Sequence, residues 1–198
     1  MPAEQPLATS PFAQFHAWMA DAEKSEPNDP NAMTVGTSTT DGQPSLRIVL
    51  LKGVDERGFV FYTNKDSRKG DELRANSKAA LLFHWKSLRR QIRIEGTVEP
   101  VAEADADAYF ASRPRISRLG AWASQQSRPL VHRTLLEERL ADMERCYPDD
   151  IPRPDYWSGY RILPEVFEFW QDMPYRLHDR TVYRRDATGA WGQTKLFP

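Results

Sequence analysis

The chain opens with the apolar periodicity of a helix that buries one face. After Ser10-Pro11, apolar side chains recur at intervals of three and four residues, as Phe12, Phe15, Trp18, Met19 and Ala22. Ser10 is a suitable N-cap, and proline is tolerated at the first helical position because its missing N–H would have no partner there. Residues 25–30 (SEPNDP) end the helix. We therefore expect residues 1–30 to form an N-terminal arm and helix, lid-like rather than a separate domain.

Between residues 32 and 101 the period changes to the two-residue alternation of strands. In residues 91–96, Gln, Arg and Glu alternate with Ile, Ile and Gly, as in a sheet with one dry face. Asp41-Gly42-Gln43-Pro44 is a turn signal between two β-rich segments, and a short helix is expected from Ser67. The strands expected here are 33–35, 47–52, 59–63, 79–85 and 91–98.

The second half of the chain continues with helices and then returns to strands. Helices are expected at 103–111, 116–124 and 129–146, the last with Leu130, Leu135, Leu136, Leu140 and Met143 facing inward. After the proline-rich stretch 148–154, strands are expected at 160–163, 166–170, 181–185 and 191–196. Strands in hairpin order with inserted helices indicate an α+β fold built on an antiparallel barrel, not a parallel doubly wound sheet. Residues 31–198 are accordingly expected to form a single domain.

The charge balance limits the classes of partner. The 198 residues hold 27 Lys and Arg against 28 Asp and Glu, so the chain has no general attraction to nucleic acid or to an anionic membrane. The basic pair Arg89-Arg90 is too small a footprint for nucleic-acid binding. No apolar run approaches the roughly 20 residues that span a bilayer, and the N-terminus lacks the pattern of a signal peptide. We expect a soluble cytoplasmic protein whose anion sites are built from a few placed cations.

Several common catalytic classes have no motif in this chain. A single cysteine, Cys146, excludes an intrachain disulfide and a multi-cysteine metal site, and it is expected to be an inert buried thiol near the end of a helix. The four histidines are scattered, so we predict no metal. The sequences GxGxxG, GxxxxGK[ST], HExxH and GxSxG are all missing, which leaves the usual nucleotide loops, metalloenzymes and serine hydrolases without support.

Cations placed at the ends of elements are the first candidate functional feature. Arg68 and Lys69 follow Ser67 at an expected helix start, where free N–H groups attract an anion. A solvated cap with surface cations is the competing interpretation. Arg47 and Lys52 flank an apolar strand, where their stems are buried and their charged heads emerge at its ends.

Two further groups offer donors for an anion. Gln126-Ser127 stands just before the expected helix at residue 129. Tyr109, Arg113 and Ser117 are spaced by four residues and share a face if the helix continues past Pro114. Their hydroxyls and guanidinium suit a phosphate, and a surface salt-bridge patch is the alternative. Separate groups of anion donors in a near-neutral chain indicate two phosphorylated ligands.

The segment 176–180 (RLHDR) concentrates charge. On an extended strand Arg176, His178 and Arg180 would point to one side. Crowding these charged side chains on one face is costly without an anionic partner. A bound anion or an electron-rich ring would offset this cost. An edge strand with solvated charges is the alternative.

These motifs, in this order and spacing, resemble the pyridoxamine 5′-phosphate oxidases from about Phe12 to Pro198. The matching segments are RIVLLK (47–52), FYTN (61–64), SRK (67–69), FHW (83–85), RRQ (89–91), YFASRPR (109–115), GAWAS (120–124), QS (126–127), FW (169–170) and RLHDR (176–180). RLHDR preceded by Trp-Gln is the most specific. Asp172 and Ser158 stand where this family usually has glycine, and Asp172 is expected to add a negative charge near a site for a phosphorylated ligand.

The resemblance implies a homodimeric, FMN-binding split β-barrel with peripheral helices and with FMN at the subunit interface. Carried over by position, the residues expected to contact FMN are Arg47, Lys52, Tyr62, Thr63, Arg68, Lys69, Gln91, Gln126, Ser127, Trp170 and Arg180. Those expected to hold the substrate phosphate are Lys52, Tyr109, Arg113 and Ser117. Arg176 and His178 are expected to cover the pyridine ring of the substrate and to act in catalysis.

The activity that the resemblance implies is oxidation of pyridoxamine or pyridoxine 5′-phosphate to pyridoxal 5′-phosphate, within vitamin B6 biosynthesis or salvage. A hydride passes from C4′ of the substrate to the flavin, O₂ is the final acceptor, and H₂O₂ is released together with NH₃ from the amine. Two alternatives remain open: a related split-barrel flavin oxidase acting on another aromatic substrate, such as a phenazine precursor, and a non-catalytic protein that binds FMN or pyridoxal phosphate.

Overall fold

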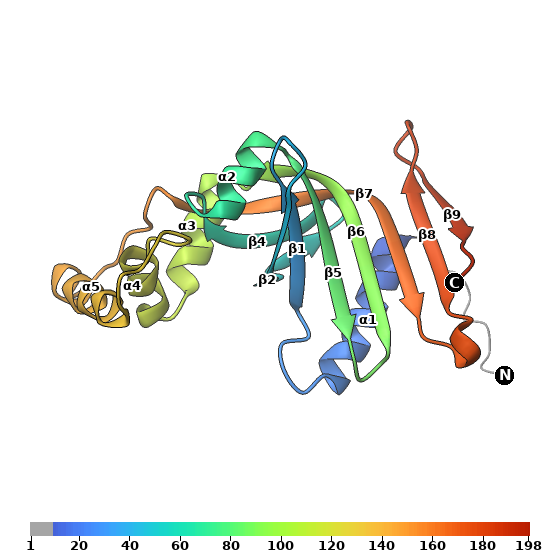
Figure 1. The fold of residues 1–198 in the computed structure, drawn as a ribbon, viewed down its shortest axis with the longest axis horizontal. Coiled ribbons are helices and arrows are strands. Elements are labelled where there is room, and N and C mark those ends of the chain that lie inside the picture. Colours follow the sequence, from blue (N-terminus) through green and yellow to red (C-terminus); the bar gives the residue numbers. More distant parts are fainter. Residues whose placement is uncertain (1–9) are drawn as a thin grey trace.

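The computed structural model describes residues 10–198, and a curled antiparallel sheet forms its centre (Figure 1). The strands are β1 (Ala32–Ser38), β2 (Pro44–Leu50), β3 (Gly53–Asp55), β4 (Gly58–Asn64), β5 (Lys78–Trp85), β6 (Arg90–Pro100), β7 (Trp157–Gln171), β8 (Asp179–Arg185) and β9 (Trp191–Lys195). The helices are α1 (Pro11–Ser25), α2 (Arg68–Ala75), α3 (Glu103–Ser112), α4 (Arg115–Ala123) and α5 (Arg133–Cys146). The predicted α+β split barrel with peripheral helices is confirmed.

The strand β7 organises the sheet. The strands of the sheet are in the order β2-β1-β5-β6-β7-β4-β3, and β8 and β9 extend the sheet from β7. One edge of β7 pairs with β6, whereas the other edge pairs first with β4 and then with β8. The change falls near Pro164, which has no N–H for the ladder, and opposite a bulge at Glu95/Gly96. A Cβ on Gly96 would lie 2.0 Å from the carbonyl oxygen of Leu163, so the bulge requires glycine.

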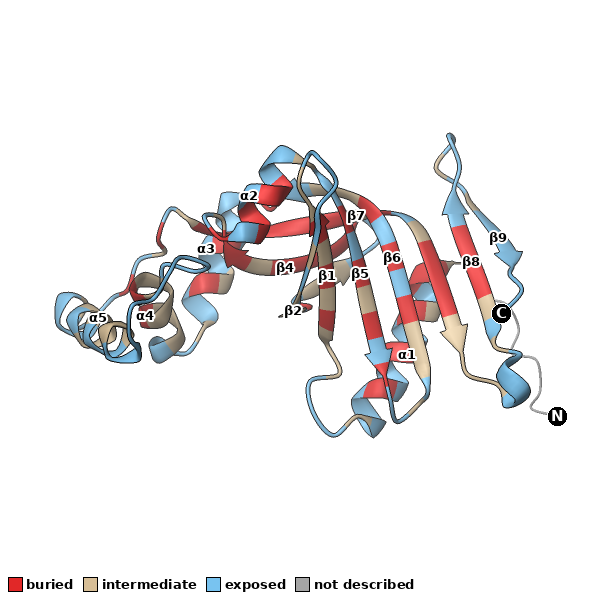
Figure 2. Cartoon of the chain, in the orientation of Figure 1, coloured by how far each residue is buried: buried red, intermediate tan, exposed pale blue. Residues whose placement is uncertain are grey.

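The main core lies between the sheet and α1. Figure 2 shows buried segments along β5, β6 and β7 and on the face of α1 that meets them. Phe15 of α1 is fully buried and packs edge-to-face against Phe59 and Phe83, with ring centroids 4.9 and 5.3 Å apart. The apolar stripe predicted for this helix is therefore confirmed, although Ser10 makes no side-chain capping bond. Residues 1–9 of the predicted arm lie outside the described part of the chain, and its lid-like role stays a prediction.

The α5 region differs from the sequence prediction. The helix begins at Arg133 rather than at residue 129, because the His132 ring caps it by accepting a hydrogen bond from the backbone N–H of Leu135 (3.1 Å). Leu130 therefore lies outside the helix and is half exposed. Cys146 does end the helix but is exposed, contrary to expectation. The inward side of α5 is only partly buried, against a second cluster that contains Phe110, Leu119, Ile151 and Trp157.

Candidate active site

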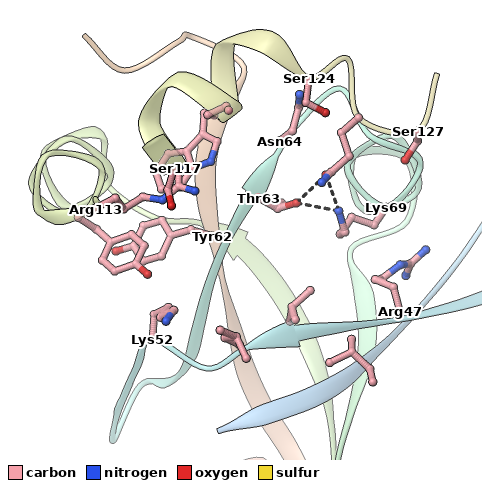
Figure 3. Close-up of a pocket in the computed structure, with 18 of the residues that line it drawn as sticks. Arg47, Lys52, Tyr62, Thr63, Asn64, Lys69, Arg113, Ser117, Ser124 and Ser127 are labelled. Atoms are coloured by element: carbon pink, nitrogen blue, oxygen red, sulfur yellow. Dashed lines mark hydrogen bonds between the residues drawn. The ribbon is translucent and has the colours of Figure 1, made fainter. Parts of the chain in front are cut away.

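A cavity of about 1060 Å³ lies among β2, β4, α2, α3, α4 and the loop that follows α4 (Figure 3). Its size suits ligands of the dimensions of cofactors and their substrates. The fold gathers at this cavity most of the ligand residues predicted from the sequence, namely Arg47, Lys52, Tyr62, Thr63, Arg68, Lys69, Tyr109, Arg113, Ser117, Gln126 and Ser127. Figure 3 shows Lys52, Arg113 and Ser117 toward one end and Arg47, Lys69 and Ser127 toward the other. The cavity thus has two cationic ends.

Lys69 is the buried cation of the first end. It lies in the first turn of α2, is only 7% exposed, and its Nζ donates to Thr63 Oγ1 (2.7 Å), Gln126 Oε1 (2.8 Å) and Ser67 Oγ (3.1 Å). It has no carboxylate partner in the part of the chain that the structure describes. Burial, with a smaller effect from Arg47, lowers the pKa of Lys69 to about 8. A buried cation held only by neutral oxygens is suited to binding an anion.

Glu72 fixes the other two cations of this end. It accepts hydrogen bonds from Arg47 Nη2 (3.3 Å) and Arg68 Nε (2.8 Å), as well as from Ser45 Oγ (2.5 Å) and Thr37. Burial alone would raise the pKa of Glu72, but these hydrogen bonds outweigh it and lower the pKa to about 2. The carboxylate is therefore ionised and orients both guanidiniums. Glu72 was not predicted from the sequence, and its one signal was the four-residue spacing from Arg68 on a helix.

Stacked aromatic rings build the second end. Tyr62 stacks on Tyr109 (4.1 Å between centroids) and on Trp157 (5.5 Å), the latter not predicted. The Arg113 guanidinium lies over Trp157 at 4.8 Å, and Lys52 Nζ lies 5.9 Å from the ring of Tyr109. Burial lowers the pKa of Arg113, and its Nη1 is buried with no hydrogen-bond partner among the described residues. This N–H donor is available to an anionic ligand.

Two local predictions about this cavity are wrong in their geometry. Tyr109, Arg113 and Ser117 do not share a helix face, because α3 ends at Ser112 and Pro114 disfavours the helical conformation at Arg113. The three residues meet the cavity instead at the corner between α3 and α4. Residues 126–127 do not start a helix either: they lie in a turn, where Ser127 has a φ of +68°.

The remaining predicted residues form a second group elsewhere in the chain. Gln91, Trp170 and Arg180 are register neighbours across β6, β7 and β8, and the His178 ring lies 4.6 Å from that of Trp170. With Arg176, these residues do not line the cavity. In Figure 1 the turn before β8 lies at the opposite end of the molecule from α3 and α4. The two groups of predicted site residues, called below the first half-site (at the cavity) and the second half-site (around Trp170 and His178), therefore do not meet within one chain.

The segment 176–180 is not the extended strand that its sequence suggested. Pro174–Arg176 forms a 3₁₀ turn in which Tyr175 and Arg176 have left-handed backbones (φ of 59° and 63°), and β8 begins only at Asp179. The reversal is needed because β7 and β8 are antiparallel neighbours joined by this segment. Arg176, His178 and Arg180 consequently do not share a strand face. The hydrogen bond from Arg180 Nε to Glu168 (2.8 Å) raises the pKa of Arg180 and supplies its anionic partner.

The basic pair Arg89-Arg90 does not form a free cationic patch. Arg89 forms an ion pair with Asp172, and Arg90 pairs with Asp21 at 2.8 Å, so this basic pair is engaged with carboxylates. No group of three or more potential metal ligands occurs in residues 10–198. Over the same residues, none of the helices combines the length and apolar character needed to cross a membrane.

Comparison with known proteins extends over nearly the whole chain. Residues 19–146 match the family model described as pyridoxamine 5′-phosphate oxidase, and residues 157–198 match the pyridoxine 5′-phosphate oxidase C-terminal dimerisation region. A pyridoxine/pyridoxamine 5′-phosphate oxidase of Gluconobacter oxydans (strain 621H) is 68% identical over 193 residues, which cover 97% of this chain and 96% of that protein. One from Caulobacter vibrioides (strain NA1000 / CB15N) is 62% identical over 189 residues, covering 95% and 85%.

Among solved structures, PhzG from Burkholderia lata 383, in complex with tetrahydrophenazine-1-carboxylic acid, superposes with a TM-score of 0.93 at 33% identity and covers 100% of this chain and 97% of its own. A pyridoxamine 5′-phosphate oxidase-related, FMN-binding protein from Nostoc punctiforme PCC 73102 shares the fold at 16% identity and a TM-score of 0.77, covering 97% and 100%. The matches to the family models, together with relatives this similar over this length, lead to one conclusion: the chain belongs to the pyridoxamine 5′-phosphate oxidase family.

Proposed function

We propose that this protein is an FMN-dependent oxidase that converts pyridoxamine 5′-phosphate or pyridoxine 5′-phosphate to pyridoxal 5′-phosphate. O₂ is the acceptor, H₂O₂ is released, and the amine substrate also yields NH₃. The observation that carries the proposal is the single cavity with two cationic ends, where Lys69 and Arg113 each offer buried donors without an anionic partner among the described residues. Two phosphorylated ligands side by side fit this arrangement.

The donor chemistry of each end suits one of these ligands. At the Lys69 end, cations, hydroxyls and an amide suit a flavin phosphate, and the residues proposed to hold FMN there are Arg47, Thr63, Arg68, Lys69, Gln126 and Ser127. At the Arg113 end, the residues proposed to hold the substrate phosphate are Lys52, Tyr109, Arg113 and Ser117. Tyr62 and Lys52 lie at the Arg113 end, around the ring of Tyr109, and are proposed to contact FMN as well.

We further propose a homodimer in which the second half-site of one subunit completes the cavity of the other. Gln91, Trp170 and Arg180 would then contact FMN, and Arg176 and His178 would cover the pyridine ring. Two observations support this arrangement. The two half-sites of one chain lie apart, and residues 157–198, which carry most of the second one, match a dimerisation region.

The protein contributes position and electrostatics to the reaction. When bound, FMN would accept a hydride from C4′ of the substrate and transfer the electrons to O₂. The cations at both ends hold the two phosphates so that C4′ is fixed near the flavin, which removes most of the entropic cost of the encounter. Arg176 and His178 orient the substrate and assist proton loss from its amine or hydroxyl. No nucleophile is required.

Purified protein tests this function directly. We expect a yellow flavin spectrum, and peroxide formation with pyridoxamine 5′-phosphate but far less with unphosphorylated pyridoxamine. Colourless protein would refute the cofactor assignment. Yellow protein that forms no peroxide would favour the non-catalytic alternative, in which FMN or pyridoxal phosphate is only bound.

The likeness to PhzG, whose structure holds tetrahydrophenazine-1-carboxylic acid, favours a second candidate function. In that case the chain would be a split-barrel flavin oxidase acting on another aromatic substrate. The Arg113 end of the cavity argues for a phosphorylated substrate instead, and one substitution separates the two functions.

Arg113→Ala is expected to raise KM for pyridoxamine 5′-phosphate at least about 10-fold with little change in kcat. The substitution removes a charge-assisted bond to a phosphate that does not react, and such bonds contribute about 1.5–3 kcal/mol. Steady-state peroxide kinetics measure both constants. Arg133→Ala on α5 is the matched control, because Arg133 is exposed and its ion pair among the described residues is with Glu137, away from the cavity. An unchanged KM in Arg113→Ala would argue against the phosphate pocket.

A further inference from the structure

The His178 ring is held on two sides in the second half-site. Its Nδ1 lies 3.2 Å from Asp172 Oδ1, and the ring contacts that of Trp170 with centroids 4.6 Å apart. Both His178 and Asp172 are largely buried, with side chains 15% and 16% exposed. The carboxylate therefore faces one nitrogen of the ring, while Nε2 has no hydrogen-bond partner among the described residues.

Asp172 is itself anchored to the turn between β5 and β6. Its backbone N–H donates to the carbonyl oxygen of Arg89 (3.0 Å), and its carboxylate forms an ion pair with the Arg89 guanidinium. Gln171 Nε2 also donates to the Arg89 carbonyl, at 3.3 Å. Arg89 lies in the tight turn between β5 and β6, with a left-handed backbone (φ of 52°). Both the main chain and the side chain of Asp172 are thus tied to this turn, so its carboxylate is well placed to orient the imidazole.

The two neighbours of Nδ1 require opposite protonation states. The Asp172 carboxylate needs a proton on Nδ1, whereas the Met173 backbone N–H, 3.3 Å from Nδ1, needs a bare nitrogen. In this structure Nδ1 accepts the hydrogen bond from Met173, and the Asp172 carboxylate stands at an ion-pair distance from it. A hydrogen bond to an ionised acceptor is about twice as strong as a neutral one, so we expect the carboxylate to prevail and to keep the proton on Nδ1. The partner of one ring nitrogen sets the tautomer and hence the state of the other.

We propose that Asp172 is a positioning residue that holds His178 in the tautomer with hydrogen on Nδ1. Nε2 is then the unprotonated nitrogen that accepts the proton lost from the substrate amine or hydroxyl. The inference rests on the proposed function, which supplies that substrate. The proposal also gives a role to the negative charge of Asp172, which stands shortly before the RLHDR segment.

Asp172→Asn tests the proposal while keeping the shape of the side chain. Arg89 would bind the amide oxygen, so the amide N–H group turns to Nδ1 and favours the tautomer with hydrogen on Nε2. Two-bond ¹H–¹⁵N spectra of histidine-labelled holoenzyme report the tautomer, and His178→Gln assigns the His178 signals. We expect hydrogen on Nδ1 in the wild type and on Nε2 in the variant. We also expect kcat to fall about 10- to 100-fold, by analogy with the loss of a carboxylate that orients a metal-bound histidine, with KM and flavin absorbance nearly unchanged.

Asp179→Asn is the matched control. It removes the same charge from a residue adjacent to His178 in the chain, but the Asp179 carboxylate pairs with Lys195 (2.5 Å) on β9 rather than with the imidazole. Neither the tautomer nor kcat should change in this variant. Wild-type kcat, or an unchanged tautomer, in Asp172→Asn would overturn the proposal.

Failure of the proposed function has a different signature. Wild-type protein would then form no peroxide with either phosphorylated substrate, which removes the role of Nε2 as proton acceptor. The spectra of wild type and Asp172→Asn would still decide whether Asp172 controls the proton on Nδ1.

Discussion

Replacing Arg176 with alanine is expected to lower kcat for pyridoxamine 5′-phosphate by about 100-fold or more, with FMN still bound. The Arg176 guanidinium has no partner within the described residues, and Arg176 lies in the left-handed turn just before His178 and β8. Removing one preorganised group that acts on the reacting part of a substrate costs about 10²–10³ in kcat. Peroxide kinetics and flavin absorbance measure the two effects. Unchanged turnover would refute the assigned role.

A mixed dimer shows whether Arg176 acts on the cavity of its own subunit or on that of the partner. Subunits carrying Arg176→Ala and Arg113→Ala are co-expressed with different tags, and the heterodimer is purified and assayed below KM. If the half-sites combine across the interface, one site of the heterodimer carries both substitutions and the other carries neither. About half of the wild-type activity should then return. If each subunit forms its own site, both sites carry one substitution and activity stays low.

Lys69→Met is expected to weaken FMN binding by about 10- to 100-fold. Methionine keeps much of the apolar stem but removes the buried charge and its donors, and a hydrogen bond to a charged group contributes about 1.5–3 kcal/mol. Quenching of FMN fluorescence on titration into apoprotein measures Kd. Lys65→Met is the matched control, because Lys65 precedes α2 on the same segment and its side chain does not line the cavity. Equal affinity in Lys69→Met and wild type would contradict the assigned phosphate site.

The same lysine predicts a pH dependence. Its pKa is about 8 in the folded apoprotein and 10.5 in the unfolded chain, so the unfolded state binds this proton more tightly. The folded apoprotein therefore bears the cost of this buried charge below pH 8, and the cost is relieved as pH rises from 8 to 10.5. A phosphate needs the charged form, so FMN affinity of the wild type should fall as pH rises above about 8. Lys69→Met should lack this fall, and parallel pH curves for the two proteins would contradict it.

Much of the first half-site was predictable because its signals are local. Ser67-Arg68-Lys69 follows a strand and opens a helix, and Arg47 and Lys52 flank an apolar run. The capacity of these residues to bind an anion can therefore be predicted from short windows of sequence. Glu72 and Trp157 could not be assigned in this way. Their roles depend on packing between residues far apart in the chain, such as the stack of Trp157 on Tyr62.

The second half-site shows a different limit. The sequence indicates an extended strand at 176–180, but Tyr175 and Arg176 adopt left-handed backbones. This conformation is uncommon outside glycine, and no glycine stands at these positions to indicate it. The sequence also predicts ligand residues without indicating which copy of the chain contributes each of them to a given site. That question arises only from the structure, which places Trp170 and His178 together but away from the cavity.

The length of strand β7 sets the spacing between the two half-sites of one chain. The strand begins at Trp157, beside the cavity, and its last residues include Trp170, beside His178. Because successive side chains of a strand alternate between faces, deleting one residue between these tryptophans would shift the later part by about 3.3 Å and put Phe169 on the face that Trp170 now occupies. In a symmetric dimer such a deletion would damage both sites at once. The length of β7 is therefore under a stricter constraint than that of the β8–β9 hairpin, whose turn at residues 186–190 can change length without moving either half-site.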